Sequence, residues 1–320
     1  MFDNEGEVEG KRDAKPTAAR RKDAGDGPCA GSSSGVNING GNGGSAGSGN
    51  ININGGGGGA MPLRPVPSRQ VLIVLHQAHS TPGHIGHWLT GNGYRLDIRR
   101  PALADDLPQS LQEHAGVIIF GGPMSANDND EFLIRERRLI EIALKERKAC
   151  LGVCLGGQLM AQVLGSRVYG DGRGRVEIGY FAIEPTPAGR EICDWPAAMY
   201  QWHREGFDLP TGARLLALSD GIFPNQAYVY GGNAVGIQFH PEITLAMIYR
   251  WTTRAAERLA LPGAKPRLAH ISDHIGFQPQ VDRWRNDFLG KLLSTGFHGD
   301  RACDMMPAEK TESLGPLPIS

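Results

Sequence analysis

A single cysteine stands between glycines in the stretch Gly152-Val153-Cys154-Leu155-Gly156-Gly157-Gln158. A short apolar run, residues 149–153, precedes the cysteine, and helix-forming residues follow it, so the stretch predicts a strand that turns abruptly into a helix. Such a turn exposes the side chain at its apex and points the first free N–H groups of the helix toward whatever that side chain attacks. Cys154 is therefore a candidate nucleophile, although the cysteine alone is equally consistent with a buried core thiol.

A histidine and a carboxylate follow a second apolar run. Phe239-His240-Pro241-Glu242 comes at the end of residues 234–239, which have the composition of a strand. A thiol nucleophile needs a base, and the base needs a partner that fixes its tautomer. Residues i and i+2 of a strand point the same way, so His240 and Glu242 can lie on one side of a sheet. His-Pro-Glu alone is a weak signal, but together with the cysteine turn it predicts a catalytic triad.

A glycine loop follows a third apolar run, residues 117–120. The loop is Gly121-Gly122-Pro123, and its exposed amides could stabilise a developing oxyanion. An ordinary turn after a buried strand is the simpler interpretation of this motif on its own.

The three motifs, in this order, resemble the class I glutamine amidotransferase domain, and the resemblance covers approximately residues 71–251. Within that superfamily the chain is most similar to stand-alone proteins related to the glutaminase domain of GMP synthase. The resemblance implies that Cys154 is the nucleophile, His240 the general base and acid, and Glu242 the carboxylate that orients the histidine.

The resemblance also implies an oxyanion hole and a substrate site. The backbone N–H groups of Gly122 and Leu155 would form the oxyanion hole. Gln158 and the main chain around Trp202 and His203 would hold the substrate glutamine. Hydrolysis of the glutamine side-chain amide would then give glutamate and ammonia, with no cofactor and no metal.

Short apolar runs alternate with helical stretches along the chain, and the runs are 71–75, 117–120 and 150–153. Fully apolar strands that alternate with helices are typical of a parallel sheet covered on both faces. Together with the resemblance, this pattern predicts an α/β fold, a flavodoxin-like three-layer sandwich with a mostly parallel central sheet. After Ser166 several short candidate strands indicate a β-rich insert, and further helices are expected at 243–259 and 281–293.

The chain divides unevenly by composition. Residues 1–66 are rich in glycine and asparagine and poor in aromatic residues, so we expect this segment to be disordered. Met61 could be an alternative start. We expect an amidotransferase domain at 67–259, a C-terminal helical extension at 260–297 and a flexible tail at 298–320.

The charge balance argues against nucleic acid or membranes as partners. The chain has 33 basic and 34 acidic residues and a net charge of -1, so no global field favours a polyanion. No apolar run reaches the length of a bilayer span, and the first residues lack the layout of a secretory signal. Five irregularly spaced cysteines give no disulfide framework, so a reducing cytoplasm is the expected compartment.

Four histidines near the first strand could suggest a metal site, namely His76, His79, His84 and His87. No nearby cysteine or carboxylate in the sequence completes a ligand set, and Pro82-Gly83 favours a loop here, so we expect no metal.

The destination of the ammonia is left open by the sequence. The chain has no room for an ATP-using synthetase after Trp251, so a separate synthetase subunit could accept the ammonia. The protein could instead hydrolyse γ-glutamyl compounds by itself, as γ-glutamyl peptidases of this fold do. A third alternative is a non-catalytic regulatory binding module, which would have no need for the complete set of Cys154, His240 and Glu242.

Overall fold

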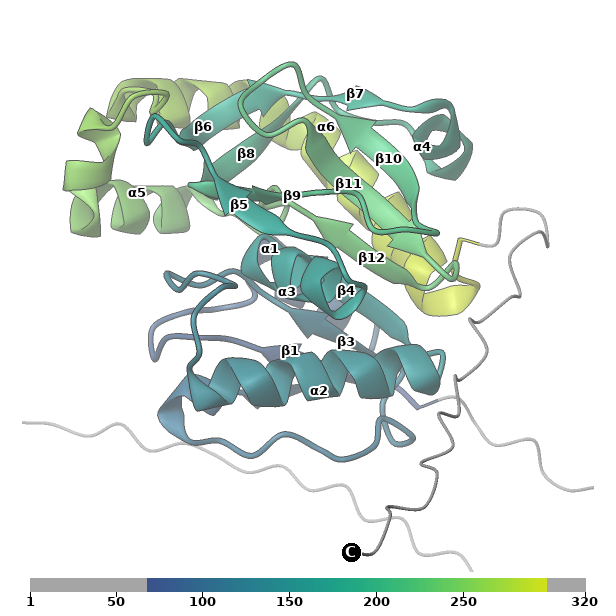
Figure 1. Cartoon of the computed structure of the whole chain (residues 1–320). Coiled ribbons are helices and arrows are strands. Elements are labelled where there is room, and N and C mark those ends of the chain that lie inside the picture. The colour runs from purple at the N-terminus through teal and green to yellow at the C-terminus, as the bar shows by residue number, and fades with distance from the viewer. Residues whose placement is uncertain (1–67, 298–320) are drawn as a thin grey trace, which may run out of the picture. The chain divides into compact units, whose positions relative to one another are not determined.

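The computed structural model describes residues 68–297. The expected disordered segment 1–66, the alternative start at Met61 and the tail 298–320 lie outside these residues. The central sheet has eight strands in the order β2-β1-β3-β4-β12-β11-β10-β7 (Figure 1). Their bounds are β1 Gln70–Val74, β2 Arg95–Arg99, β3 Gly116–Ile119, β4 Ala149–Val153, β7 Glu184–Pro185, β10 Arg214–Leu218, β11 Asn225–Tyr230 and β12 Ala234–Ile237.

The sheet is parallel from β2 to β12 and antiparallel beyond it. This arrangement confirms the predicted α/β class with a mostly parallel central sheet. The apolar runs expected to be buried strands form β1, β3 and β4, which are neighbours inside the parallel part of the sheet. Strands covered on both faces need apolar residues at every position, because neither side of the strand meets water.

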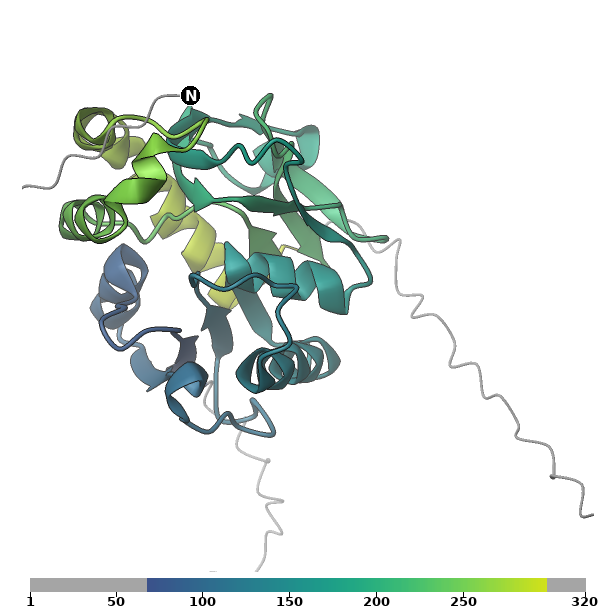
Figure 2. The same ribbon diagram turned by 60° about the vertical axis from the view of Figure 1, so that its left-hand side comes forward.

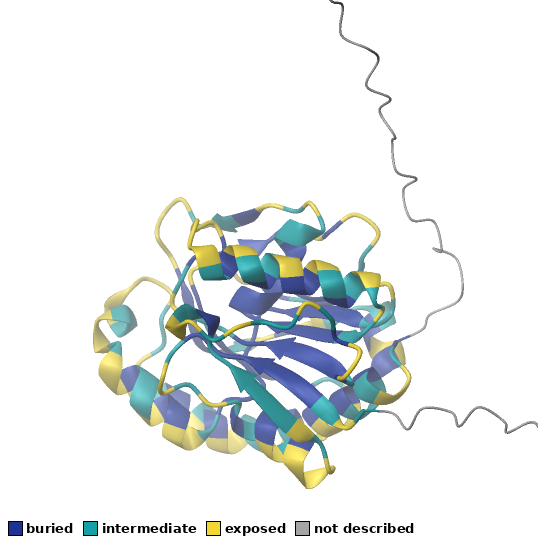
Figure 3. Cartoon of the chain, turned by 90° about the horizontal axis from the view of Figure 1, so that it is seen from below, coloured by how far each residue is buried: buried dark blue, intermediate teal, exposed yellow. Residues whose placement is uncertain are grey.

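Helices cover both faces of the sheet (Figures 1 and 2). Successive residues of β1 point to opposite faces, so Val71 and Ile73 belong to one apolar cluster and Leu72 and Val74 to the other. The first cluster includes residues of α1 (Gly83–Gly91) and α6 (Arg267–Ser294), and the second includes residues of α2 (Glu131–Lys145) and α3 (Leu155–Val163). The buried strands therefore lie between two helical layers, whose outer faces are exposed (Figure 3).

The β-rich region after Ser166 is divided between three sheets. Two small antiparallel sheets pair β5 (Val168–Gly170) with β9 (Glu205–Phe207) and β6 (Glu177–Ala182) with β8 (Ala198–His203). The remaining strands β7, β10 and β11 join the antiparallel side of the central sheet. The insert expected from the sequence is thus partly an extension of the main sheet.

Several elements differ from the sequence-based expectation. The loop expected around Pro82-Gly83 ends there, because α1 begins at Gly83. The helix expected at 243–259 is α5 (Leu245–Arg254) followed by a 3₁₀ turn, η2 (Ala256–Ala260). The helix expected at 281–293 starts earlier, as α6 continues through Pro279. Two short elements complete the described fold, α4 (Pro187–Ile192) and η1 (Pro101–Leu103).

The strand register brings three loops to one edge of the sheet. β3, β4 and β12 are neighbours, with Ile119 opposite Gly152 and Ile237 opposite Val153. The carboxyl ends of these parallel strands therefore lie side by side, which is where open α/β sheets bind their ligands. Within residues 68–297, every helix is too short or too polar to cross a membrane.

Candidate active site

Cys154 lies at the junction of β4 and α3 with a strained backbone. Its φ is 51°, a left-handed value that few non-glycine residues adopt. Two backbone segments approach each other closely at this turn, since a Cβ added to Gly152 would lie 2.4 Å from the carbonyl carbon of Gly156. A Cβ on Gly156 would in turn lie 2.2 Å from the carbonyl oxygen of Ile119. The two glycines are therefore required by the sharp turn from strand to helix that presents the cysteine.

His240 and Glu242 form a buried pair just beyond β12. Nδ1 of His240 lies 2.8 Å from Oε1 of Glu242, and both side chains are almost fully buried. Burial lowers the pKa of His240, but its interactions with Glu242 and Cys154 outweigh the effect of burial and raise that pKa to about 10. The arrangement therefore favours the imidazolium form of His240.

Cys154 and His240 meet beside the glycine loop. A Cβ added to Gly121 would lie 2.8 Å from Cε1 of His240 and 3.4 Å from Cβ of Cys154, so both side chains border this glycine. Nε2 of His240 is buried and makes no hydrogen bond of ordinary geometry within residues 68–297. It is the ring nitrogen left to face the thiol, because Nδ1 is held by Glu242.

The two residues whose N–H groups are expected to form an oxyanion hole are neighbours in the structure. A Cβ added to Gly122 would lie 3.0 Å from Cδ2 of Leu155, the first residue of α3. Leu155 also follows Cys154 directly, so its N–H is one of the first free donors of the helix. The structure thus brings together Cys154, His240, Glu242, Gly122 and Leu155.

Comparisons with known proteins show the family of the chain. The family model for class I glutamine amidotransferases matches residues 84–247, more than half of the chain. The chain belongs to this family. It is 30% identical over 201 residues to a glutamine amidotransferase-like protein of Salmonella typhimurium, covering 60% of this chain and 83% of that protein.

Other relatives within the amidotransferase family carry different names. One is a subunit of the glutamine-hydrolyzing GMP synthase of Methanocaldococcus jannaschii, and the match is 30% identical and covers 42% of this chain and 68% of that protein. The match to gamma-glutamyl peptidase 5 of Arabidopsis thaliana is 28% identical and covers 44% of this chain and 59% of the peptidase. A crystal structure of a glutamine amidotransferase from Methylobacillus flagellatus superposes with a TM-score of 0.67 at 27% identity, covering 74% of this chain and 100% of that one.

In this member of the family the side chains of the residues expected to hold glutamine contact other groups of the protein. The amide Nε2 of Gln158 donates to the carbonyl oxygen of Glu205 at 2.8 Å. Nδ1 of His203 lies 3.0 Å from the same carbonyl oxygen, and its Nε2 lies 3.2 Å from Oε2 of the buried Glu177. The ring of Trp202 is half-buried between aromatic neighbours, with Trp251 at 5.6 Å. The main chain of Trp202 and His203 belongs to β8, which is paired with β6.

Gln238 is a site residue that sequence reasoning missed. Its Nε2 points at Sγ of Cys154 at 3.7 Å, and its Oε1 accepts a hydrogen bond from Gln158 at 3.3 Å. Gln238 is completely buried. A polar glutamine inside the apolar run 234–239 was the available signal, since buried amides need partners.

The four histidines near the first strand are divided between a loop and a helix. His76 lies in the loop after β1 and is buried, His79 is exposed, and His84 and His87 lie on α1. Within the described residues, no three His, Cys, Asp or Glu side chains are arranged to hold a metal ion.

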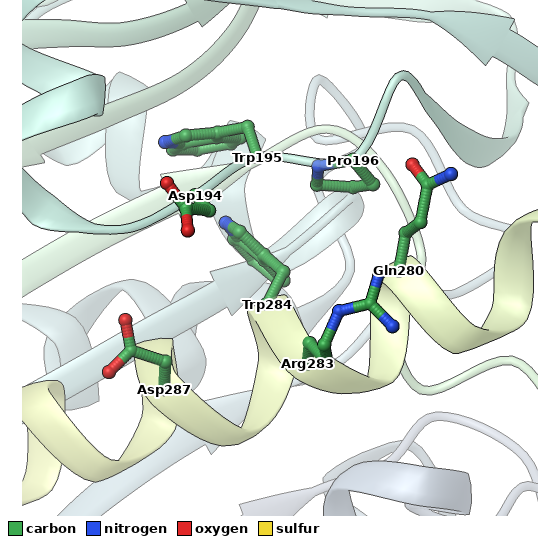
Figure 4. Close-up of a pocket in the computed structure, with 7 residues that line it drawn as sticks. All are labelled: Asp194, Trp195, Pro196, Gln280, Arg283, Trp284 and Asp287. Atoms are coloured by element: carbon green, nitrogen blue, oxygen red, sulfur yellow. The ribbon is translucent and has the colours of Figure 1, made fainter.

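A cavity of about 310 Å³ lies away from the glycine loop, between the segment before β8 and α6 (Figure 4). Its lining residues are Asp194, Trp195, Pro196, Gln280, Arg283, Trp284 and Asp287. None of the candidate site residues lines this cavity. Aromatic packing links the cavity to the candidate site, since the rings of Trp195 and Trp284 lie 6.3 and 5.6 Å from the ring of Phe239, the neighbour of His240.

Proposed function

We propose that this protein is a glutamine amidotransferase-type hydrolase that cleaves a γ-glutamyl amide with Cys154 as nucleophile. The observation that carries the proposal is the strained cysteine turn beside the buried His240–Glu242 pair. A backbone strained in this way persists only where the surrounding structure imposes it, and such strain is concentrated at functional sites.

In the proposed reaction Nε2 of His240 already holds the proton of Cys154, which the carboxylate of Glu242 supports, so the sulfur acts as a thiolate. The thiolate attacks the γ-carbonyl carbon, and the N–H groups of Gly122 and Leu155 bind the oxyanion. His240 then returns its proton to the leaving nitrogen, which departs as ammonia or an amine. His240 then takes a proton from water, whose oxygen attacks the carbonyl carbon of the γ-glutamyl thioester; glutamate is released, and the thiolate of Cys154 and the protonated His240 are regenerated.

Two versions of this chemistry differ in what leaves. The relatives that are named as subunits of GMP synthase support glutamine as substrate, with a separate synthetase that accepts the ammonia. The relative named gamma-glutamyl peptidase 5 supports a γ-glutamyl peptide or conjugate, with no acceptor. A non-catalytic regulatory module of the same fold is the remaining alternative. The free thiols Cys150, Cys154 and Cys193 support a reducing compartment, and we propose the cytoplasm.

The test measures glutamate, which both versions release. Purified protein is incubated with glutamine and, separately, with γ-glutamyl dipeptides. We expect Cys154→Ala to lower glutamate release by at least about 10⁴-fold, because the covalent route is lost. The matched control is Cys193→Ala, which removes a buried thiol outside the candidate site and should leave turnover unchanged.

Substrate preference then separates the alternatives. Faster release from glutamine supports the amidotransferase version, and faster release from γ-glutamyl dipeptides supports the peptidase version. Turnover retained by a folded Cys154→Ala protein would rule out the proposed nucleophile. A wild-type protein inert toward both substrates would favour the binding module.

A further inference from the structure

His76 is a buried histidine directly behind the glycine loop. Its Nδ1 lies 3.1 Å from the carbonyl oxygen of Gly121, and its Nε2 lies 3.0 Å from Oε2 of Glu136 on α2. The ring also packs against the next residue, since a Cβ added to Gly122 would lie 2.9 Å from Cγ of His76. One side chain therefore contacts both residues of the Gly121–Gly122 peptide.

This contact determines which way the peptide faces. A carbonyl oxygen only accepts hydrogen bonds, so Nδ1 of His76 carries the proton and donates it to Gly121. In a trans peptide the C=O and the following N–H point in opposite directions. Holding the carbonyl of Gly121 toward His76 thus directs the N–H of Gly122 away from His76. Two consecutive glycines would otherwise allow this peptide to rotate, because neither has a Cβ that restricts it.

A contribution to folding stability does not by itself explain why a buried pair of His76 and Glu136 is present. Both side chains are fully buried, and Oε1 of Glu136 has no hydrogen-bond partner within residues 68–297. Apolar residues of similar volume at such a buried pair are often as stabilising or more so. A carboxylate at Nε2 does, however, complete the second hydrogen bond of the ring and so fixes its orientation toward Gly121.

We propose that His76 and Glu136 are positioning residues, which hold the Gly121–Gly122 peptide so that the N–H of Gly122 is available to the oxyanion formed at Cys154. The inference rests on the proposed function and extends it to two residues that act through the Gly121–Gly122 peptide. Glu136 orients His76, His76 orients the peptide, and the peptide binds the oxyanion.

The experiment compares two replacements of His76. His76→Phe keeps an aromatic ring but has no N–H, whereas His76→Asn places a side-chain amide donor near the position of Nδ1. We expect kcat for glutamate release to fall by about 10- to 100-fold in His76→Phe, less than the about 10²- to 10³-fold effect of losing an oxyanion donor completely, because the peptide is released but not removed. KM should change less than about threefold. His76→Asn should recover most of this loss. Glu136→Leu should lower kcat in the same direction, and Glu136→Gln, which can still bond Nε2, should do so less.

Two further measurements isolate the positioning role. Alkylation of Cys154 by iodoacetamide forms no oxyanion, so its rate should be the same in wild type and His76→Phe. A crystal structure of His76→Phe should show the Gly121–Gly122 peptide rotated or in two orientations. The proposal is overturned if kcat of His76→Phe stays within threefold of wild type, if His76→Asn is as slow as His76→Phe, or if alkylation slows in parallel with kcat. If wild type releases no glutamate, the proposed function fails, and an unrotated peptide in the crystal structure then overturns the positioning role separately.

Discussion

At the scale of single residues, the site depends on strain and burial that the surrounding chain imposes. Cys154 has a φ of 51°, a conformation that costs a non-glycine residue about 1–3 kcal/mol. Its backbone N–H donates to the carbonyl oxygen of Ile237 at 2.8 Å, which ties the turn to β12. The same strand leads to Gln238 and His240. The cysteine and the groups that act on its sulfur are therefore fixed by one pair of neighbouring strands, β4 and β12.

The protonation of His240 gives a prediction for pH dependence. Its pKa in the folded protein is raised from 6.5 to about 10, so its contribution to stability is fully present below about pH 6.5 and is lost as pH rises toward 10. Replacing Glu242 by glutamine removes a charge that raises this pKa. We expect the fall in unfolding free energy between pH 6.5 and 10 to be smaller in Glu242→Gln than in wild type, as measured by urea denaturation at several pH values.

The control for this prediction is Glu191→Gln, which changes an exposed carboxylate and should leave the wild-type pH profile intact. An equally steep fall in Glu242→Gln would show that the carboxylate does not support the protonated histidine.

At the scale of elements, α6 is much longer than the helix expected from its sequence. Proline removes a backbone donor and usually ends or kinks a helix, and the helix expected from the sequence, 281–293, lies entirely after Pro279. In the structure α6 continues on both sides of Pro279. Aromatic rings pack on both sides of the proline, since Phe277 stacks on Tyr180 at 5.5 Å and Trp284 stacks on Phe288 at 4.5 Å. The boundary expected at residue 260, between the amidotransferase domain and the helical extension, falls before α6. The apolar side of α6 packs in the same core cluster as strands of the sheet.

The packing of α6 leads to a prediction about stability. Trp284 is 2% exposed and contacts Trp195, Phe239 and Phe288. Trp284→Ala should lower the unfolding free energy by about 3–5 kcal/mol, because a large buried side chain leaves a cavity. On the same helix Leu268 is 79% exposed, so Leu268→Ala should change it by less than about 0.5 kcal/mol. Urea denaturation of the three proteins checks both values, and similar losses in the two variants would contradict the role assigned to α6.

At the scale of the whole molecule, short motifs could be predicted from the sequence, but contacts between residues far apart in the chain could not. The turn at Cys154 and the pair His240–Glu242 are short motifs after apolar strands, so they could be predicted directly. The contact of Gln238 with Cys154 joins residues 84 positions apart, and that of His76 with Glu136 joins residues 60 apart. No local pattern encodes such pairs. The edge strand β2 was missed for a related reason, because its half-exposed sequence Arg-Leu-Asp-Ile-Arg lacks the continuous apolar character of the central strands.

The connection between the β6–β8 sheet and the central sheet provides the last prediction. Glu177 is fully buried, and it accepts hydrogen bonds from the N–H of Ile222 at 2.7 Å and from Nε2 of Gln226 on β11 at 3.4 Å. Burial raises the pKa of Glu177, but its hydrogen bond and charge interaction with His203 and the backbone donors lower it by more. Its contribution to stability is therefore present above about pH 4.5 and is lost as pH falls through the lowered folded pKa.

Glu177→Gln should lower the unfolding free energy by about 3 kcal/mol at neutral pH, and the difference from wild type should shrink in acid. The exposed Glu184→Gln should match wild type at every pH, and a Glu177→Gln protein as stable as that control at neutral pH would show that the two sheets are joined by other contacts.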